Sequence, residues 1–345
     1  MTHVSLISPC LNEAEVIEPF YARLCSLAAC ESGRDFEFIL VDDGSTDGTG
    51  LILDRLADRD PRVRVLHLAR NCGHQIALTA GMDFASGDVV VTLDADLQDP
   101  PEVVPMLLAK IDEGFDIVHA QRRSREGETW FKRCTARLFY RLLRLISKES
   151  PREECGDFRA FTRPVLLAMR GFRERHRYLR GLFAALGFRQ AVLPYDRTPR
   201  AAGHTKFPLA RMIALAVDGI LSFSSAPLKS VLWLGCALWA VSLLFIVRAC
   251  IGHFILHRTV PGWTSLVVLL TFFTGLNLFC LSVIGAYVGK IFEQGQGRPL
   301  YWCSRLRNVD FGTLGPEALQ TPEVALSRLT ADQREAAGHT RNEPA

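Results

Sequence analysis

Two aspartates spaced two residues apart directly follow a short apolar run in the N-terminal half of the chain. Asp94 and Asp96 come after residues 89–93, a β-branched run bounded by glycine and proline that predicts a buried strand. Open α/β sheets bind ligands at the carboxyl ends of their strands. The pair therefore predicts a site for a hard divalent cation that also holds a diphosphate. A similar pair, Asp58 and Asp60, ends a predicted helix, and we interpret it as solvated surface.

Further polar residues follow two other predicted strands. Asn12 and Glu13 come after the first strand, and Asp42 and Asp43 after the second. Carboxylates at this edge can accept hydrogen bonds from a base and a ribose. An alternative interpretation of residues 43–47 is a helix cap and an Asx-turn, which need the same residue types.

Strands and helices alternate along the first 120 residues. The predicted strands are 4–8, 36–41, 63–68, 89–93 and 115–119. The predicted helices are 16–27, 51–56, 74–85 and one that begins at Pro101. This alternation predicts an α/β domain with a mainly parallel sheet that helices cover on both faces.

Three segments after residue 128 are predicted to contact a membrane. Residues 129–148 form a basic amphipathic helix that suits a membrane interface, the alternative being a solvated basic face. Two apolar segments, 231–256 and 264–288, can each span about 30 Å of hydrocarbon. Basic residues on both outer flanks predict a two-helix hairpin with its ends in the cytosol. A buried hairpin in a soluble core is the alternative.

Composition and the N-terminus narrow the class of protein. The ten cysteines include no C-x-x-C pair, which argues against a zinc knuckle or a disulfide framework. The N-terminus carries no signal-peptide pattern, so we expect a cytosolic domain. The net charge of +3 by itself says little about partners, and we expect no nucleic-acid partner. The predicted parts are a catalytic domain (1–206), a juxtamembrane helix (207–227), the two spans (228–292) and a C-terminal tail (293–345).

Motifs in a fixed order resemble a known family. ISPCLNE (7–13), VDDGSTD (41–47), NCGHQ (71–75) and DADLQDPPE (94–102) follow the order of glycosyltransferase family 2. GDFR (156–159), RAAGHTK (200–206) and GRPLY (297–301) resemble the polyprenyl-phosphate glycosyltransferases of that family. The resemblance covers about residues 4–302 and implies a GT-A-type (Rossmann-like) fold. It also implies inverting transfer of a sugar from a nucleotide sugar, UDP-glucose being favoured, to polyprenyl (undecaprenyl) phosphate.

The resemblance also implies roles for individual residues. Asp94 and Asp96 would bind Mg²⁺ or Mn²⁺, with Asp96 the direct ligand, and Asp94, Asp96 and Asp157 would be catalytic. The lipid phosphate would contact Arg122, Lys132 and Arg133. The nucleotide sugar would contact Pro9, Asn12, Glu13, Asp42, Asp43, Ser45, Asp47, Gln75, Asp94, Gln98, Arg200 and Lys206. Alternatives are a salt bridge between Asp157 and Arg159, a structural cap at His74, and membrane-facing roles for the cations.

The chemistry of a phosphate acceptor and several departures from the usual family residues bear on the choice of substrate. A phosphate acceptor is already anionic near neutral pH, so it needs no strong general base. Cys72, Cys155 and the HTKF run at 204–207 depart from the usual family residues, and GDP-mannose, UDP-GlcNAc and UDP-aminoarabinose stay open as donors. Competing hypotheses are a processive polysaccharide synthase, whose Q-x-x-R-W signature is absent from the sequence, and a non-catalytic scaffold. We further expect a homo-oligomer, with a tetramer possible, in a bacterial plasma membrane.

Overall fold

A computed structural model describes residues 2–122, 155–175, 177–196 and 262–312, with isolated positions between 228 and 251 and near 325. The chain divides into two compact units. Unit 1 comprises 1–135, 149–206 and 298–345, and unit 2 comprises 136–148 and 207–297. The basic helix at 129–148, the juxtamembrane helix, Lys132, Arg133, Arg200 and Lys206 lie outside the described residues. So does the first apolar segment, apart from isolated positions.

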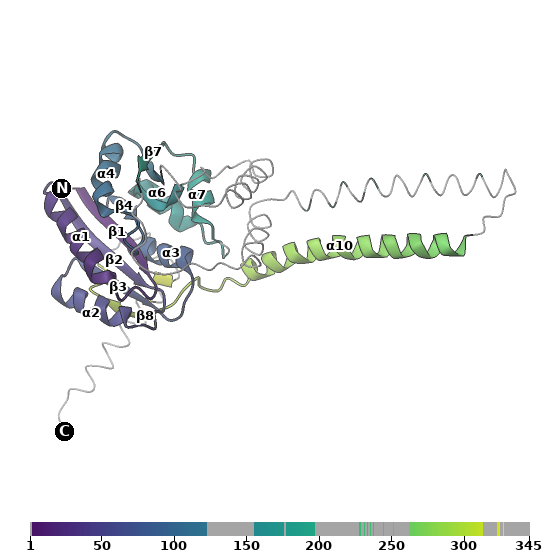
Figure 1. The fold of residues 1–345 in the computed structure, drawn as a ribbon, viewed down its shortest axis with the longest axis horizontal. Coiled ribbons are helices and arrows are strands. Elements are labelled where there is room, and N and C mark those ends of the chain that lie inside the picture. The colour runs from purple at the N-terminus through teal and green to yellow at the C-terminus, as the bar shows by residue number, and fades with distance from the viewer. Residues whose placement is uncertain are drawn as a thin grey trace, which may run out of the picture. The chain divides into compact units, whose positions relative to one another are not determined.

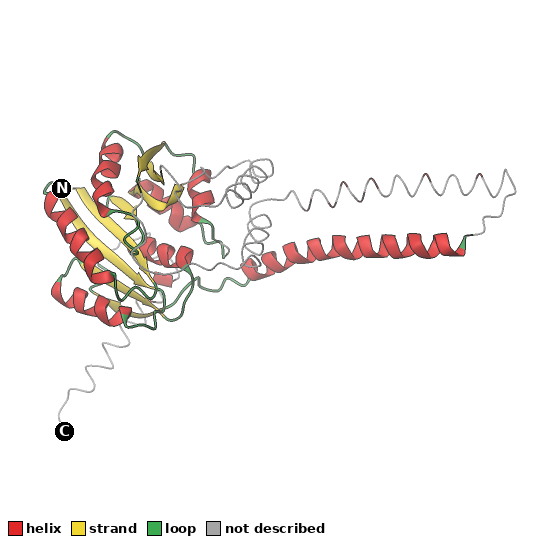
Figure 2. Ribbon diagram, in the orientation of Figure 1, coloured by secondary structure: helices red, strands yellow, loops and turns green. Residues whose placement is uncertain are grey.

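Unit 1 is built on one eight-stranded sheet with the order β7-β5-β6-β4-β1-β2-β3-β8 (Figures 1 and 2). Parallel pairing joins β4, β1, β2 and β3, and also β5 with β7. β6 is antiparallel to both β4 and β5, and β8 is antiparallel to β3. The sheet is therefore mixed but mainly parallel. The strands are β1 (Thr2–Cys10), β2 (Arg34–Asp42), β3 (Val63–Leu68), β4 (Val89–Thr92), β5 (Ile117–Arg122), β6 (Cys155–Thr162), β7 (Gln190–Tyr195) and β8 (Cys303–Arg307).

Helices cover both faces of this sheet, which explains why the central strands carry apolar side chains on both faces. Phe38 and Leu40 of β2 belong to one core with α1, α2 and α4, and Ile39 and Val41 belong to a second core with α3, α6 and α7. Successive side chains of a strand point to opposite faces, so both sets are buried. The helices are α1 (Ile17–Cys30), α2 (Thr49–Arg59), α3 (His74–Phe84), η1 (Pro101–Val103), α4 (Val104–Asp112), α6 (Arg163–Gly171) and α7 (Leu179–Ala185).

Several sequence predictions need correction. The fifth strand begins and ends later than the predicted 115–119, and β6, β7 and β8 were not predicted. Residues 303–307 were assigned to the tail, yet they complete the sheet as β8. Asp60, which the sequence predicts to be solvated, is only 7% exposed, and its carboxylate accepts hydrogen bonds from Tyr21 and Arg62.

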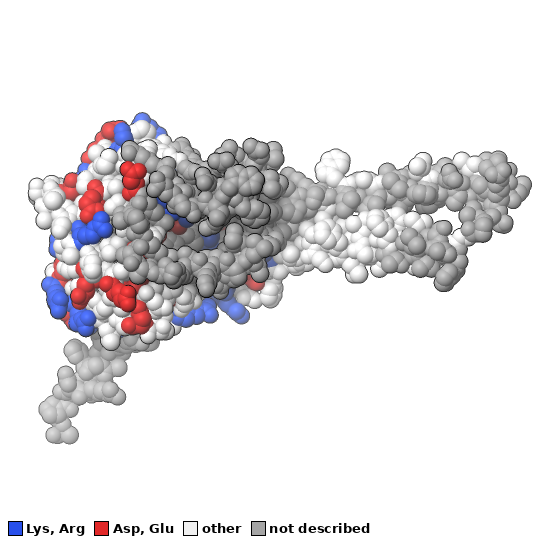
Figure 3. Space-filling model, in the orientation of Figure 1, with Lys and Arg blue, Asp and Glu red and all other residues white. Residues whose placement is uncertain are grey.

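Unit 2 contains α10 (Trp263–Gly295), which corresponds to the second predicted span. Within it, Phe272–Gly295 has a mean hydropathy of 1.6 with none of its window buried, so this helix is long and apolar enough to cross a membrane. In Figure 3 the visible surface along most of α10 carries no Lys, Arg, Asp or Glu. It is the one helix with these properties among the described residues, and the predicted hairpin is not established.

A buried ion cluster joins the segment before β8 to α3. The Tyr301 hydroxyl donates to Asp83 Oδ2 at 2.9 Å, and Arg173 donates to both Asp83 oxygens at 3.0 and 2.9 Å. Arg173 also pairs with Glu323, whose Oε1 accepts from the Leu300 backbone N–H at 2.8 Å. Residues far apart in the sequence thus neutralise one carboxylate inside the core.

Replacing Tyr301 with Phe should destabilise unit 1. The variant removes one donor from the buried Asp83 carboxylate, so we expect a loss of about 1–2 kcal/mol. That corresponds to a fall of about 2–8 °C in Tm, measured by thermal unfolding of the full chain in detergent. Trp302→Phe is the matched control because Trp302 is 52% exposed. Equal Tm values for the two variants would contradict the assigned role of Tyr301.

Candidate active site

The predicted site residues meet because β1 pairs in parallel with strands on both sides. Cys10 is in register with Asp42 at the ends of β1 and β2, and Ile7 is in register with Thr92 on β4. Pro9 lies beside Val41 in the same ladder. The loops after β1, β2 and β4 therefore leave the sheet at the same edge, where α/β folds place their ligands.

The loops after β1 and β2 are joined by reciprocal hydrogen bonds. The Asn12 backbone N–H donates to Ser45 Oγ at 3.1 Å, and the Thr46 N–H donates to Asn12 Oδ1 at 2.8 Å. Asp47 accepts from the N–H groups of Ala14 and Thr49 at 3.1 and 3.0 Å. Ser45 and Asp47 thus perform the loop-forming role considered as an alternative. Their contact with a nucleotide stays a prediction.

The Glu13 backbone is held in the same way, by donation from its N–H to Thr49 Oγ1 at 2.9 Å. Asn12 has a φ of +55°, a left-handed conformation that asparagine tolerates better than most residues. The backbone of this corner is therefore fixed by α2 and the β2 loop, and the structure brings both predicted residues to the expected edge.

Asp42 and Asp43 are buried, and each uses both carboxylate oxygens within the protein. Asp42 Oδ2 lies 2.8 Å from His67 Nδ1, and Oδ1 accepts from the Ser45 N–H at 2.9 Å. Asp43 accepts from the backbone N–H groups of Cys72 and Gly73 at 2.7 and 2.9 Å. Asp43 consequently connects the loop after β3 to the end of β2. Their predicted bonds to base and ribose would have to use remaining lone pairs.

Opposing effects act on these two carboxyl groups. Burial raises the pKa of Asp42, but hydrogen bonds from His67 and Ser45 outweigh it, so the pKa falls below its usual value. For Asp43 burial outweighs the two backbone donors, and the pKa is raised. Asp42 is therefore the more firmly ionised of the pair.

Asp94 and Asp96 occupy the turn after β4, as predicted. The Gln98 backbone N–H donates to Asp96 Oδ1 at 3.1 Å, and Gln98 is buried beside it. Leu97 between them has a φ of +61°, which is strained for a leucine and is characteristic of functional turns. Asp94 Oδ1 is inaccessible and forms no hydrogen bond, although His74 Nε2 lies 3.5 Å away.

Burial raises the pKa of Asp94 to about 6, and the negative charges of Asp99, Asp96 and Asp157 add to the rise, while His74 opposes it. A buried carboxylate oxygen without a donor, surrounded by further carboxylates, is an arrangement that a cation would stabilise. The residues present therefore fit the predicted Mg²⁺ or Mn²⁺.

The protein supplies only part of a coordination sphere. Within the described ranges, no group of three or more His, Cys, Asp or Glu side chains could hold a metal ion. Mg²⁺ is often bound by one or two carboxylates together with substrate phosphates and water. Asp94 and Asp96 would then hold the ion while a diphosphate completes the site.

Asp157 of β6 receives donors from four side chains. Arg180 of α7 binds both of its oxygens at 3.2 and 3.1 Å, and Gln75 Nε2 donates to Oδ2 at 3.1 Å. Arg159 Nη2 donates to Oδ1 at 3.1 Å, which confirms the salt bridge considered from the sequence. His74 Nε2 lies 3.4 Å from Oδ2. The contacts of Asp157 thus link β6 to α3 and α7 close to the Asp94 turn.

This environment fixes the charge of Asp157. Burial alone would raise its pKa, but the hydrogen bond from His74 and the charges of Arg180 and Arg159 lower it far below the usual range. The pKa of His74 is raised, because the hydrogen bond to Asp157 and the charges of Asp94 and Asp157 outweigh the opposing effect of burial. An acid held this firmly as an anion is a poor proton acceptor, so the geometry favours an orienting role for Asp157.

Arg122, the predicted lipid-phosphate residue, ends β5 next to a second buried acid. Its Nη2 lies 3.9 Å from Asp99 Oδ1, which accepts from the Tyr195 hydroxyl at 2.5 Å. Arg122 Nε also donates to Tyr195 at 3.4 Å. A Cβ on Gly156 would come within 3.3 Å of Arg122, so the glycine gives the guanidinium room.

Sequence reasoning missed three residues of this site: Asp99, Arg180 and Tyr195. Asp99 lies in the 94–102 motif, whose pattern could have indicated it. Arg180 and Tyr195 lie on α7 and β7, far along the chain, and no local pattern distinguishes them from other arginines and tyrosines. Only the position of those elements against β5 and β6 brings them to the site.

Comparison with known proteins identifies the class to which this fold and site belong. The family model described as "Glycosyl transferase family 2" matches residues 5–169. An uncharacterized glycosyltransferase, YkcC of Bacillus subtilis, is 40% identical over 306 residues, which cover 89% of this chain and 94% of the relative. The chain therefore belongs to glycosyltransferase family 2, and it is a glycosyltransferase.

Two further proteins are similar to this chain, one in sequence and one in structure. The bactoprenol glucosyl transferase of Shigella phage SfV is 37% identical over 298 residues, covering 86% of this chain and 97% of that protein. Glucosyl-3-phosphoglycerate synthase from Mycobacterium tuberculosis was solved with Mn²⁺, UDP and phosphoglyceric acid. It matches with a TM-score of 0.44 and 23% identity, over 64% of this chain and 76% of that one.

Replacing Asp94 with Asn should stabilise the metal-free fold at neutral pH. The pKa of Asp94 is about 6 in the folded protein, above the value of about 3.9 for an unperturbed aspartate, so its ionisation opposes folding. The penalty is absent below about pH 4, grows between about pH 4 and 6, and is complete above that range. Thermal unfolding in chelator should therefore show a Tm advantage for Asp94→Asn at pH 7.5 that shrinks by pH 5. Parallel pH profiles for variant and wild type would contradict this environment.

Proposed function

We propose that this glycosyltransferase transfers glucose, with inversion, from a nucleoside-diphosphate glucose to polyprenyl phosphate. UDP-glucose is the favoured donor and undecaprenyl phosphate the favoured acceptor. A relative that matches over 97% of its length is named bactoprenol glucosyl transferase, which supports this acceptor class. The apolar α10 in the same chain supports a substrate that resides in a membrane.

One observation carries the proposal. At the carboxyl edge of the sheet, the charges of Asp96, Asp99 and Asp157 act on Asp94. The side chains of Arg122 and Arg180 lie 3.9 and 3.1 Å from Asp99 and Asp157, respectively. The acidic turn at Asp94 and Asp96 suits a cation with a diphosphate, and guanidinium groups suit a phosphate oxygen. A donor diphosphate and an acceptor phosphate both need such neutralisation before they can approach each other.

The proposed reaction requires no proton transfer from the acceptor. An anionic phosphate oxygen attacks the anomeric carbon, the new C–O bond forms on the opposite face, and the bond to the nucleoside diphosphate breaks. A divalent cation at Asp94 and Asp96 would stabilise the negative charge on the departing diphosphate. Arg122 would orient the acceptor phosphate, and Asp157 would hold Arg180 and His74 in position. The depressed pKa of Asp157 is consistent with a mechanism that lacks a general base.

We further propose a two-helix membrane hairpin, of which α10 is the second helix, with the catalytic domain on the cytosolic face of a bacterial plasma membrane. Residues 263–289 of α10 contain no charged side chain, and this uncharged stretch supports a span. A homo-oligomer remains part of this proposal, and it can be measured directly on the purified protein in detergent.

The direct test is a donor screen with the full chain in detergent. Labelled UDP-glucose and undecaprenyl phosphate should give metal-dependent label in the lipid phase, because the acceptor carries the glucose into that phase. Parallel reactions with GDP-mannose, UDP-GlcNAc and UDP-aminoarabinose identify the preferred sugar. Label in a long polymer would indicate a processive synthase instead. An absence of turnover with every donor would contradict the proposal.

Replacing Asp96 with Ala should reduce turnover by at least about 100-fold, because the charge on the leaving diphosphate loses its stabilisation. The fold should survive, since Asp96 is only partly buried and accepts a local hydrogen bond from the Gln98 backbone within the same turn. Asp112→Ala is a control at an exposed site on α4. A variant that remains active without added metal would refute the role assigned to Asp96.

A further inference from the structure

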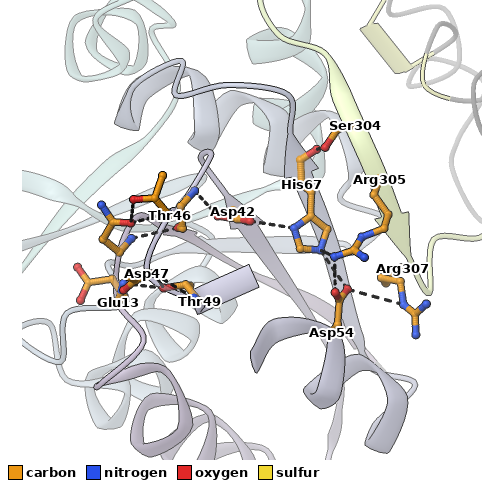
Figure 4. A network of polar contacts seen from close by, with 12 residues as sticks. Glu13, Asp42, Thr46, Asp47, Thr49, Asp54, His67, Ser304, Arg305 and Arg307 are labelled. Carbon is orange, nitrogen blue, oxygen red and sulfur yellow. Dashed lines mark hydrogen bonds and ion pairs between the residues drawn. The ribbon is translucent and has the colours of Figure 1, made fainter. Parts of the chain in front are cut away.

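The imidazole of His67 connects two carboxylates inside unit 1 and has no place in the reaction described above. His67 lies on β3 and is 6% exposed. Its Nδ1 lies 2.8 Å from Asp42 Oδ2, and its Nε2 lies 3.1 Å from Asp54 Oδ1 (Figure 4). Both ring nitrogens thus face acids on different elements, β2 and α2.

On one side the contacts continue to β8, the strand that the sequence did not predict. Arg305 pairs with Asp54, and its Nη2 lies 3.4 Å from His67 Nε2. Arg307 Nε lies 3.9 Å from the same Asp54 carboxylate. Ser304 Oγ donates to the His67 backbone carbonyl at 3.1 Å. Figure 4 shows these β8 side chains directed at Asp54 and His67.

On the other side the contacts reach the loops assigned to the nucleotide. Asp42 accepts from the Ser45 N–H at 2.9 Å, and the Ser45 hydroxyl accepts from the Asn12 N–H at 3.1 Å. An added Cβ on Gly50 would lie 2.9 Å from Asp42 Oδ2 and 3.4 Å from the His67 ring. α2 is therefore packed closely against this hydrogen-bonded pair, and little free space is left beside it.

The contact with Asp42 requires a hydrogen-bond donor at position 67, which a side chain of similar volume without a donor could not supply. An ionised carboxylate can only accept, so His67 Nδ1 carries the proton that it shares with Asp42. An apolar side chain at position 67 would leave a buried carboxylate oxygen without its donor, which is costly in a low-dielectric interior. The Asp42 carboxylate would then rotate toward another donor, and its hydrogen bond with the Ser45 backbone N–H would lose its fixed geometry.

We propose that His67 is a positioning residue for the donor nucleotide, and that it couples the docking of β8 to nucleotide binding. The inference rests on the proposed nucleotide-sugar function and extends it to β3 and β8. Coupling between two sites is reciprocal. A nucleoside diphosphate that fixes the β1 and β2 loops should therefore also hold β8 more firmly on β3.

Nucleotide binding provides the first test, with UDP titrated into the full chain by calorimetry. His67→Leu should weaken UDP binding by about tenfold, the effect of losing one hydrogen bond to a charged group. The KM for UDP-glucose should rise in parallel, whereas kcat should stay within about threefold, because His67 touches no reacting atom. His67→Asn retains a donor for Asp42 and should bind UDP within about threefold of wild type.

Hydrogen exchange of the β8 amides provides the second test. Saturating UDP should slow exchange across Cys303–Arg307 in the wild type. This response should disappear in both His67 variants. Leucine has no donor for Asp42 or Asp54, and asparagine is too short to contact Asp54 as well as Asp42. Ser304→Ala is the matched control: it removes a β8 contact with His67 but leaves the imidazole contacts intact, and it should keep both UDP affinity and the exchange response.

The outcomes separate this inference from the proposed function. A wild type that neither binds UDP nor transfers glucose contradicts the proposed function with that donor. If the His67→Leu variant binds UDP as tightly as the wild type, the inference is overturned and the proposed function is not affected. Failure of His67→Asn to restore binding would reduce His67 to a structural residue and also overturns it. Should His67→Leu fail to fold, Arg305→Met tests the same coupling, with loss of the β8 exchange response as the expected result.

Discussion

The parallel pairing of β1 with β2 on one side and β4 on the other is the constraint on which the site depends. It brings the ends of three strands to one edge in a register fixed by Cys10 opposite Asp42 and Ile7 opposite Thr92. Both faces of these strands are buried, and a slip of one residue would exchange the two faces. The register is therefore strongly determined, and with it the spacing between the donor loops and the Asp94 turn.

The second constraint is electrostatic. Carboxylates gather at this edge, and the protein treats them differently. Asp157 is paired with fixed cations, and Asp42 forms hydrogen bonds with His67 and the Ser45 backbone N–H. Asp94, in contrast, keeps a buried oxygen without a hydrogen bond and a pKa raised to about 6. The carboxylates with internal partners hold the architecture. The one without a hydrogen-bond donor is where a cation is most useful, at a cost to the stability of the metal-free fold.

The antiparallel strands add what the parallel core lacks. β6 runs back between β4 and β5, so that Asp157 near its start lies beside the carboxyl end of β4, where Thr92 Oγ1 donates to the Asp157 carbonyl at 2.5 Å. β8 covers the opposite edge at β3 and supplies Arg305 to the His67 contacts. Each brings residues from a distant part of the sequence to the parallel core.

The sequence by itself determined the elements whose signals are local. Apolar runs between turn residues located β1 to β4, apolar residues at helical spacing in 16–27 located α1, and the strand before Asp94 identified the acidic turn. The motifs located the family. Tertiary structure alone decided the rest: β8 in place of a tail, the burial of Asp60, and the contacts of Asp157 with Arg180 and of His67 with Asp42 and Asp54. These features depend on contacts between residues that lie far apart in the chain. The role of a charged side chain is set by its partners and its burial, and the residue type alone does not reveal either.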